Sequence, residues 1–276
     1  MSLATELKSM NQDLIRYFVV DAFTDHPFGG NPAAVVLLSE WPDDAWLQNV
    51  AMEMNLSETA FLVPNQNRFD LRWFTPAVEV DLCGHATLAS AFAILHAGLQ
   101  EDKTQMEFST RSGVLSAASH GDRIQLNFPL KRVSPTIPPV DLLEGLSVTP
   151  TYVGKSEYDY LVEVETEHEL RSVAPRFDQL AKLDCRGIIV TSSSTDPEFD
   201  FSSRFFGPAV GVDEDPVTGS AHCCLAHHWQ KRTGRDCFTA FQASQRGGVV
   251  HLTVKQDRVL LAGNAIIVAQ GELLVR

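Results

Sequence analysis

The sequence predicts an α+β protein made of two pseudo-symmetric lobes, each a mixed or curled β-sheet around a central α-helix. Two observations lead to this prediction. The first is an internal duplication, in which related stretches recur at a nearly constant spacing. The second is a pair of helices so apolar that only surrounding strands could bury them.

The duplication is clearest at the helix starts. Gly84 and the residues after it recur from Gly219, 135 positions later, and the hairpin sequences that follow keep the same spacing. Upstream, "RWFTPAVEVDLCG" and "RFFGPAVGVDEDPVTG" match at a spacing of 132, so the second copy contains three extra residues. Aligning their aspartates places these extra residues at 214–216. Three successive matches indicate a duplicated unit rather than chance.

Each copy predicts a strand, a proline-containing turn, a helix and then a strand hairpin. The aromatic stretches "LRWFTP" and "SRFFGP" predict short strands that end at Pro76 and Pro208. Residues 84–95 and 220–229 predict the central helices, and Gly234 is suited to end the second one. "GVLSAASHGDRIQLNF" and "GVVHLTVKQDRVLLAG" alternate in polarity, which predicts hairpins with Gly-Asp and Gln-Asp turns.

The proline-rich residues 127–145 are the predicted linker between the lobes. We predict a first lobe of residues 12–117, completed by a C-terminal strand at 265–276. The second lobe is predicted to cover residues 118–264, with a cleft between the two.

Composition narrows the classes of partner and the compartment. The 276 residues carry a net charge of −13, with pI near 5.1, which argues against nucleic acid or an anionic membrane as a partner. The five cysteines are odd in number and lack CxxC spacing, which argues against a disulfide framework. The N-terminus lacks the apolar core of a signal peptide, and no apolar run approaches the roughly 20 residues that span a bilayer. We therefore expect a cytoplasmic protein.

The two helix starts are the predicted binding positions. Their free backbone N–H groups and positive dipole ends favour a carboxylate, and Gly84 and Gly219 permit close approach. Pseudo-symmetry predicts that the starts face each other across the cleft, where small molecules commonly bind. The expected partner is therefore a small carboxylate-bearing substrate. Polar side chains stand beside these glycines: His85, Asp215, Thr218 and Ser220.

Each of these side chains also has a purely structural interpretation. Thr218 and Ser220 are common N-cap residues, and Asp215 could support a turn. His85 could be a core histidine bonded to backbone. We favour the functional interpretation for the cluster, because the second copy has a carboxylate beside its helix start that the first copy lacks.

Other candidates look ordinary when taken alone. Glu58 precedes an apolar strand and would pass for a solvated surface group, and Asn31 in "FGGNP" would pass for part of a tight turn. Four residues of the second helix suggest metal ligands: Cys223, Cys224, His227 and His228. Their two i,i+4 pairs point about 100° apart on a helix and lack further ligands, so we predict packing and no metal.

Four stretches carry a resemblance to a known family: "DAFTDHPFGGNPAAVVLL", "NLSETAFL", "RWFTPAVEVDLCGHATLA" and "GVDEDPVTGSAH". In these stretches the chain resembles the PhzF-like isomerases, which are named for the phenazine-biosynthesis isomerase and have the diaminopimelate epimerase-like fold. The resemblance extends from about residue 15 to the C-terminus. It implies an isomerase with two lobes around a cleft, no cofactor and frequently a homodimer.

The resemblance also implies roles for individual residues. The catalytic glutamate of the family's NLSET sequence corresponds to Glu58, so the resemblance overturns the surface interpretation of this residue. His85 and Asp215 correspond to the family's histidine and aspartate that support this glutamate in catalysis. The ligand-contacting positions correspond to Asn31, Gly84, Gly219 and Ser220. We add Thr218 to this binding set because of its place at the second helix start.

The predicted function is cofactor-independent movement of a proton on a small carboxylate by general acid/base catalysis. Related epimerases place one cysteine at each helix start, but here only Cys83 is present, which disfavours a two-thiol racemase. One alternative is a thiol-dependent enzyme using Cys83, although residues 83 and 85 on a helix start are expected to point in different directions. The other alternative is a non-catalytic small-molecule-binding or scaffold protein that keeps the fold.

Overall fold

The computed structural model describes residues 14–100 and 105–274, which form two compact units. The first unit comprises the chain through Asn127 and again from Ala262, and the second comprises Phe128–Leu261. Each unit is a mixed β-sheet with a long buried helix, so the predicted α+β class is confirmed.

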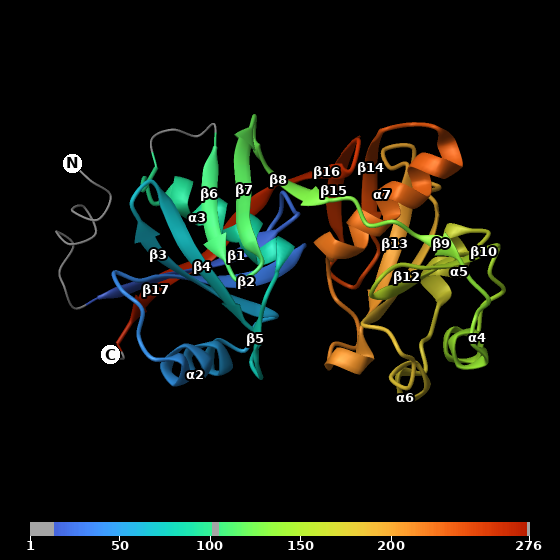
Figure 1. The fold of residues 1–276 in the computed structure, drawn as a ribbon, viewed down its shortest axis with the longest axis horizontal. Coiled ribbons are helices and arrows are strands. Elements are labelled where there is room, and N and C mark those ends of the chain that lie inside the picture. The colour runs from blue at the N-terminus through green and yellow to red at the C-terminus, as the bar shows by residue number, and fades with distance from the viewer. Residues whose placement is uncertain (1–13, 101–104, 275–276) are drawn as a thin grey trace. The chain divides into compact units, whose positions relative to one another are not determined.

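The elements of the first unit follow the predicted order of strands, turn, helix and hairpin (Figure 1). They are β1 (Ile15–Ala22), β2 (Asn31–Leu37), α2 (Asp44–Met54), β3 (Glu58–Asn65), β4 (Arg68–Phe74), β5 (Glu79–Val80), α3 (Gly84–His96), β6 (Met106–Thr110), β7 (Gly113–His120), β8 (Arg123–Pro129) and β17 (Ala265–Leu273).

The sheet of the first unit combines antiparallel and parallel pairs. Strand β1 lies between β17 and β2, and β2 and β3 run parallel. Strands β3 and β4 are antiparallel, β4 and β6 are parallel, and β6, β7 and β8 form an antiparallel series. The C-terminal strand β17, drawn in red, therefore lies beside the blue β1 (Figure 1).

Helix α3 is buried because its sequence offers almost no polar face. Nine of its side chains are buried, and strands β1, β2, β3, β7 and β17 contact it. The shorter α2 packs a second apolar cluster, in which Leu47 and Val50 lie with Phe61 and Phe74 of the strands. The sheet thus has apolar contacts on both faces, which explains the long apolar runs in β2 and β3.

The second unit repeats this arrangement with its own peripheral helices. Its elements are β9 (Ser134–Pro135), α4 (Val140–Leu146), β10 (Tyr152–Lys155), β11 (Asp159–Glu163), α5 (Glu167–Ser172), α6 (Phe177–Leu180), β12 (Gly187–Ser193), β13 (Phe201–Phe206), the 3₁₀ helix η1 (Pro208–Val210), α7 (Gly219–Thr233), β14 (Cys237–Gln242), β15 (Gly248–Lys255) and β16 (Arg258–Gly263).

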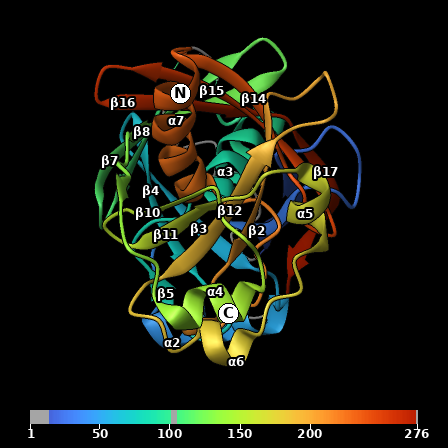
Figure 2. The same cartoon turned by 90° about the vertical axis from the view of Figure 1, so that its right-hand side faces the viewer.

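The strand pairing of the second unit matches that of the first. Strands β10 and β11 are antiparallel, β11 and β12 parallel, β12 and β13 antiparallel, β13 and β14 parallel, and β14 and β15 antiparallel. Helix α7 has ten buried residues and contacts β15, and the two lie close together in Figure 2. Gly234 ends α7 in the left-handed conformation, with φ 74°, as its position predicts.

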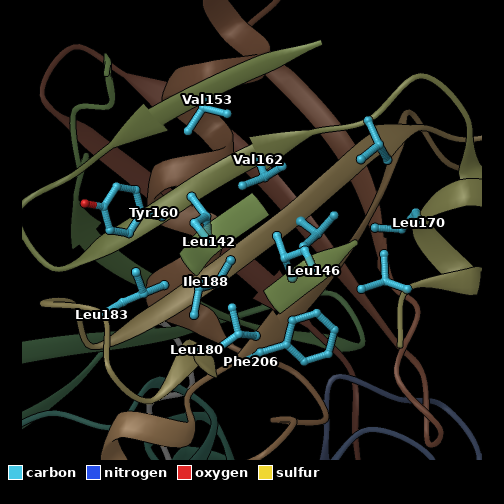
Figure 3. Packing of buried hydrophobic residues seen from close by; sticks show 13 residues of the cluster. Leu142, Leu146, Val153, Tyr160, Val162, Leu170, Leu180, Leu183, Ile188 and Phe206 are labelled. Atoms are coloured by element: carbon cyan, nitrogen blue, oxygen red, sulfur yellow. The ribbon is translucent and has the colours of Figure 1, made fainter. Parts of the chain in front are cut away.

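A separate apolar cluster fixes the peripheral helices of the second unit. Figure 3 shows Leu142 and Leu146 of α4 beside strand residues that include Val162 and Ile188. Burying a leucine side chain contributes about 2 kcal/mol, so such a cluster can anchor even short helices.

The boundary between the units lies later in the chain than predicted. A boundary after residue 117 would cut β7 within its pairing with β8, whereas the first unit continues to Asn127. The hairpin of β7 and β8 stays whole because both strands belong to one antiparallel series.

Two equivalent ion pairs show where the duplicated halves differ in length. Arg72 donates two hydrogen bonds to the carboxylate of Glu79, and Arg204 donates two to Glu214. The arginines are 132 positions apart and the glutamates 135, so the three extra residues lie between Arg204 and Glu214.

The predicted insertion at 214–216 is therefore wrong. The extra residues are 211–213, directly after η1, and Asp215 corresponds to Val80 of the first unit. Asp215 is thus a substituted position rather than an inserted one.

Candidate active site

The first unit brings three predicted site residues together. Glu58 begins β3 and Asn31 begins β2, and because β2 and β3 run parallel their starts lie at the same edge of the sheet. His85 lies in the first turn of α3. Its Nε2 is 3.0 Å from Oε2 of Glu58, and its Nδ1 is 3.2 Å from Nδ2 of Asn31.

The side chains of Glu58 and His85 lie within ion-pair distance, but they do not meet the geometry of a hydrogen bond. The Oε2 and Nε2 atoms are buried, yet neither has an aligned hydrogen-bond partner among the described residues. His85 and Asn31 are almost fully buried, whereas 19% of the Glu58 side chain remains exposed. Glu58 is therefore the member of this cluster that a small molecule can reach.

The surroundings of His85 favour its charged form. Burial by itself lowers the pKa of the imidazole, but its contacts with Cys83 and with the Glu58 carboxylate outweigh burial and raise the pKa well above 6.5. Burial also raises the pKa of the Cys83 thiol, which therefore stays neutral near pH 7. Glu58 then supplies the negative charge that holds the proton on His85.

Cys83 contacts His85, contrary to the expectation that the two would point apart. Its Sγ lies 3.5 Å from Nδ1 of His85. The expectation was wrong because Cys83 is the N-cap of α3 and has an extended backbone, with φ −142° and ψ 113°, so helical spacing does not apply to it. The raised thiol pKa nevertheless disfavours a nucleophilic thiolate.

Glu58, Cys83 and His85 do not fit a single metal ion. Their candidate ligand atoms lie within 4.8 Å of one another. However, the Cys83 sulfur faces Nδ1 of the imidazole and the Glu58 carboxylate faces Nε2. An ion bound to one ring nitrogen would lie on the wrong side of the ring for the third ligand, and metal sites require convergent ligands.

Both central helices begin at the predicted glycines, and neither start is capped by a side chain. Helix α3 begins at Gly84 after Cys83, and α7 begins at Gly219 after Thr218, with no N-cap side-chain hydrogen bond in either case. The capping interpretation of Thr218 is therefore wrong. Such uncapped N–H groups can donate hydrogen bonds to an anion.

The Thr218 hydroxyl serves Asp215 in the second unit instead. It donates a 2.5 Å hydrogen bond to Oδ2 of Asp215. Thr218 and Gly219 are buried, while Ser220 and Asp215 are half-buried. Below them, the His222 imidazole is held 2.8 Å from the carbonyl oxygen of Thr218, and burial lowers its pKa to about 4.

Gln242 belongs to the same cluster and was not predicted from the sequence. Its Oε1 accepts a hydrogen bond from Thr218 N at 2.9 Å, and its Nε2 donates to the carbonyl oxygen of Asp215 at 2.7 Å. A signal was available in β14, where Phe238, Ala240 and Gln242 form the buried alternating set. A polar side chain at such a position needs buried partners.

The four suspected metal ligands of α7 have structural partners. His227 Nδ1 accepts from Val133 N, and His228 Nε2 lies 3.0 Å from Oε2 of Glu163. Cys223 donates to the carbonyl oxygen of Gly219, and burial raises the pKa of Cys224 to about 12. These contacts support the packing interpretation.

The predicted residues thus form one cluster in each unit. Asn31, Glu58, Gly84 and His85 belong to the first unit, and Asp215, Thr218, Gly219 and Ser220 to the second. That the two clusters act on one substrate stays a prediction. Within the part of the chain that the structure describes, no helix is both long and apolar enough to cross a membrane.

Comparison with known proteins identifies similar chains along nearly the whole length. Residues 20–271 match the family described as phenazine biosynthesis-like protein. A protein of Halalkalibacterium halodurans described as an uncharacterized isomerase is 51% identical over 259 residues, which cover 94% of this chain and 98% of that protein.

Solved structures agree with this similarity. A crystal structure of a PhzF family protein from Enterococcus faecalis superposes with a TM-score of 0.91 at 37% identity, covering 95% of this chain and 100% of that one. A probable proline racemase from Agrobacterium radiobacter superposes with a TM-score of 0.67 at 11% identity, covering 95% and 93% of the two chains, which shows a shared fold.

Proposed function

The chain belongs to the family of phenazine biosynthesis-like proteins and is an isomerase, and we propose that it moves a proton within a small carboxylate-bearing substrate, with Glu58 as general acid/base. The proposal includes no cofactor. The single observation that supports it most is the reachable Glu58 carboxylate beside the buried His85.

The proposed step needs only one proton-transferring group. Glu58 would remove a proton from a carbon next to an unsaturated or electron-withdrawing group, and the electron pair left behind would shift along the substrate. The same carboxyl group would then return the proton to another carbon on the same face, so that nothing is oxidised or lost. His85, held charged beside Glu58, would limit the build-up of negative charge.

In the first unit, the start of α3 would hold the substrate. We place the substrate carboxylate against the N–H groups that follow Gly84, where the helix dipole favours negative charge. Asn31 would supply a further polar contact. In the second unit, the helix start at Gly219, with Ser220 and Asp215, offers the same kind of anion-binding groups. Thr218 is too deeply buried for direct contact, with 7% of its surface exposed, and acts through Asp215.

Hydrogen exchange in deuterated water tests the proposal. The wild-type protein should incorporate deuterium into at least one member of a panel of small carboxylates that includes cyclic diene acids and amino-acid derivatives. Glu58→Gln keeps the shape of the side chain but removes the base, so the exchange rate should fall by about 10³-fold. Mass spectrometry of the recovered acids measures both rates.

The matched control is Glu53→Gln, the same substitution on an exposed residue of α2, which should leave the exchange rate unchanged. A wild-type protein that causes no exchange on any acid of the panel would indicate a binding or scaffold protein. Full-rate exchange by Glu58→Gln would exclude this glutamate as the base.

A further inference from the structure

The Gln242 side chain connects several polar groups at the second helix start. It is fully buried at the end of β14. One amide oxygen and one amide nitrogen serve three groups: Thr218 N at 2.9 Å, the Asp215 carbonyl oxygen at 2.7 Å, and Thr218 Oγ1 at 3.3 Å.

These partners determine the orientation of the amide. A backbone N–H can only donate, so the Gln242 atom facing Thr218 N must be the oxygen. A carbonyl can only accept, so the atom facing the Asp215 carbonyl must be the nitrogen. A flipped amide would place donor against donor and acceptor against acceptor in a site without exposed surface.

The amide orientation then fixes the direction of the Thr218 hydroxyl. Its oxygen accepts from Gln242 Nε2, so its single proton is available for the Asp215 carboxylate, whose Oδ2 is 2.5 Å away. Hydrogen bonds to a carboxylate are short and strong. The backbone of Asp215 is also held at both polar groups, because its N–H donates to the carbonyl oxygen of Phe205.

The duplicated unit shows that the fold does not require this network. In both units a serine hydroxyl holds the loop before the helix, with Ser112 bonded to the Asp81 carbonyl and Ser244 to the Pro216 carbonyl. Only the second unit adds Gln242. The strand pairing places Thr110 at the equivalent position of the first unit, where its hydroxyl bonds within its own turn.

We infer that Gln242 is a positioning residue for Asp215, which it directs through the Thr218 hydroxyl and through the Asp215 carbonyl. This inference rests on the proposed function in so far as Asp215 faces the substrate. The network holds one carboxylate oxygen of Asp215 as the acceptor of the Thr218 hydroxyl. The first unit has Val80 in place of Asp215 and lacks this network.

Four variants test the inference through the Thr218 hydroxyl. Thr218→Val keeps the volume and removes the hydroxyl, so kcat should fall about 10- to 100-fold with a similar melting temperature, because a misplaced polar group costs rate. Thr218→Ser loses the methyl group but keeps the hydroxyl, so it should restore kcat. Gln242→Leu should lower kcat as well, and the double variant should lose less than the sum of the two single losses, because the two residues share the Thr218 hydroxyl.

The matched control is Thr233→Val at the opposite end of α7, where the hydroxyl bonds to the Trp229 carbonyl. It should leave kcat unchanged. Full activity in Thr218→Val, or additive losses in the double variant, would overturn the inference.

A measurement without substrate separates this inference from the proposed function. In protein labelled with ¹³C at the aspartate carboxyl carbon, the Asp215 signal should shift in both Thr218→Val and Gln242→Leu, and should not shift in Thr233→Val. If the wild type exchanges no hydrogen but these shifts occur, the proposed function fails and the network stands. If the wild type is active and Gln242→Leu leaves the signal in place, the inference fails and the proposed function stands.

Discussion

Strand β3 of the first unit begins with Glu58, whereas the corresponding strand of the second unit, β12, begins with Gly187. The correspondence follows from the pairing, because each residue begins a strand that runs parallel to its neighbour on one side. A Cβ atom at Gly187 would overlap the ring of Phe205. The second unit therefore has no room for a side chain at the position where the first has Glu58, the proposed base.

The starts of the two central helices also differ in their polar side chains. His85 in the first unit corresponds to Ser220 in the second, while Asp215 of the second corresponds to Val80 of the first. Duplication preserved the sheet order and the two uncapped helix starts, but each unit kept different polar groups. This asymmetry supports one acid/base group rather than the matched pair that a symmetric two-base racemase needs.

The largest expected effect comes from making the first helix start resemble the second. His85→Ser copies Ser220 and removes the imidazole beside Glu58, so the rate of deuterium incorporation should fall by about 10²- to 10³-fold. Mass spectrometry of the product measures the rate. His96→Ser, at the exposed far end of α3, is the control and should exchange hydrogen like the wild type. An unchanged rate in His85→Ser would mean that the imidazole at the first helix start does not contribute to catalysis.

A second effect comes from the residues one turn into each helix. Thr87 in α3 and His222 in α7 are equivalent, and each lies in hydrogen-bond contact with the N-cap carbonyl, from Thr87 Oγ1 to Cys83 and from His222 Nδ1 to Thr218. Burial lowers the pKa of His222 to about 4, although its backbone hydrogen bond opposes this shift. Unfolding releases the imidazole to its usual pKa near 6.5.

The sign of the pH dependence follows from proton binding. Between pH 6.5 and pH 4 the unfolded chain binds a proton at His222 that the folded unit does not, so stability falls as the pH falls, by up to about 3 kcal/mol. His222→Thr copies Thr87 and should remove this slope. Hydrogen exchange of α7 peptides between pH 4 and 6.5 measures it, and a slope that survives the substitution would assign it to other groups.

His85 should produce the opposite slope in the first unit. Its folded pKa is raised, so its contribution to stability is complete below pH 6.5 and is lost as the pH rises through the folded value. The α3 peptides should therefore exchange faster relative to the α7 peptides above neutral pH. The same mass-spectrometric experiment at pH 6.5 to 9 checks this.

The elements that depend on local sequence were predictable. Both central helices begin at the predicted Gly84 and Gly219, because a glycine before an apolar stretch is a local signal. Glu58 carried no such signal, since its place beside His85 depends on the parallel pairing of β2 with β3. Its proposed role came from family resemblance alone.

Two errors share a physical cause, which is that sequence letters do not show contacts. Aligning two aspartates placed the insertion at 214–216, whereas the ion pairs of Arg72 and Arg204 place it earlier. Gln242 escaped notice because its partners lie 24 and 27 residues away and only the folded sheet brings them together. A buried polar group at an alternating strand position was the remaining clue.

The smallest expected effect concerns the hairpin turns, where the two copies differ only in side chain. Gly121 has φ 67° and its equivalent Gln256 has φ 58°, a left-handed conformation that costs a residue with a side chain about 1–2 kcal/mol. Gln256→Gly should relieve this cost but loosen the unfolded chain, so the net gain in stability should stay below about 1 kcal/mol. Gln125→Gly, the same substitution within strand β8, should instead lower stability by about 0.5–1 kcal/mol. Urea unfolding of both variants measures the two signs, and a loss of stability in both would show that Gln256 makes contacts that outweigh its backbone strain.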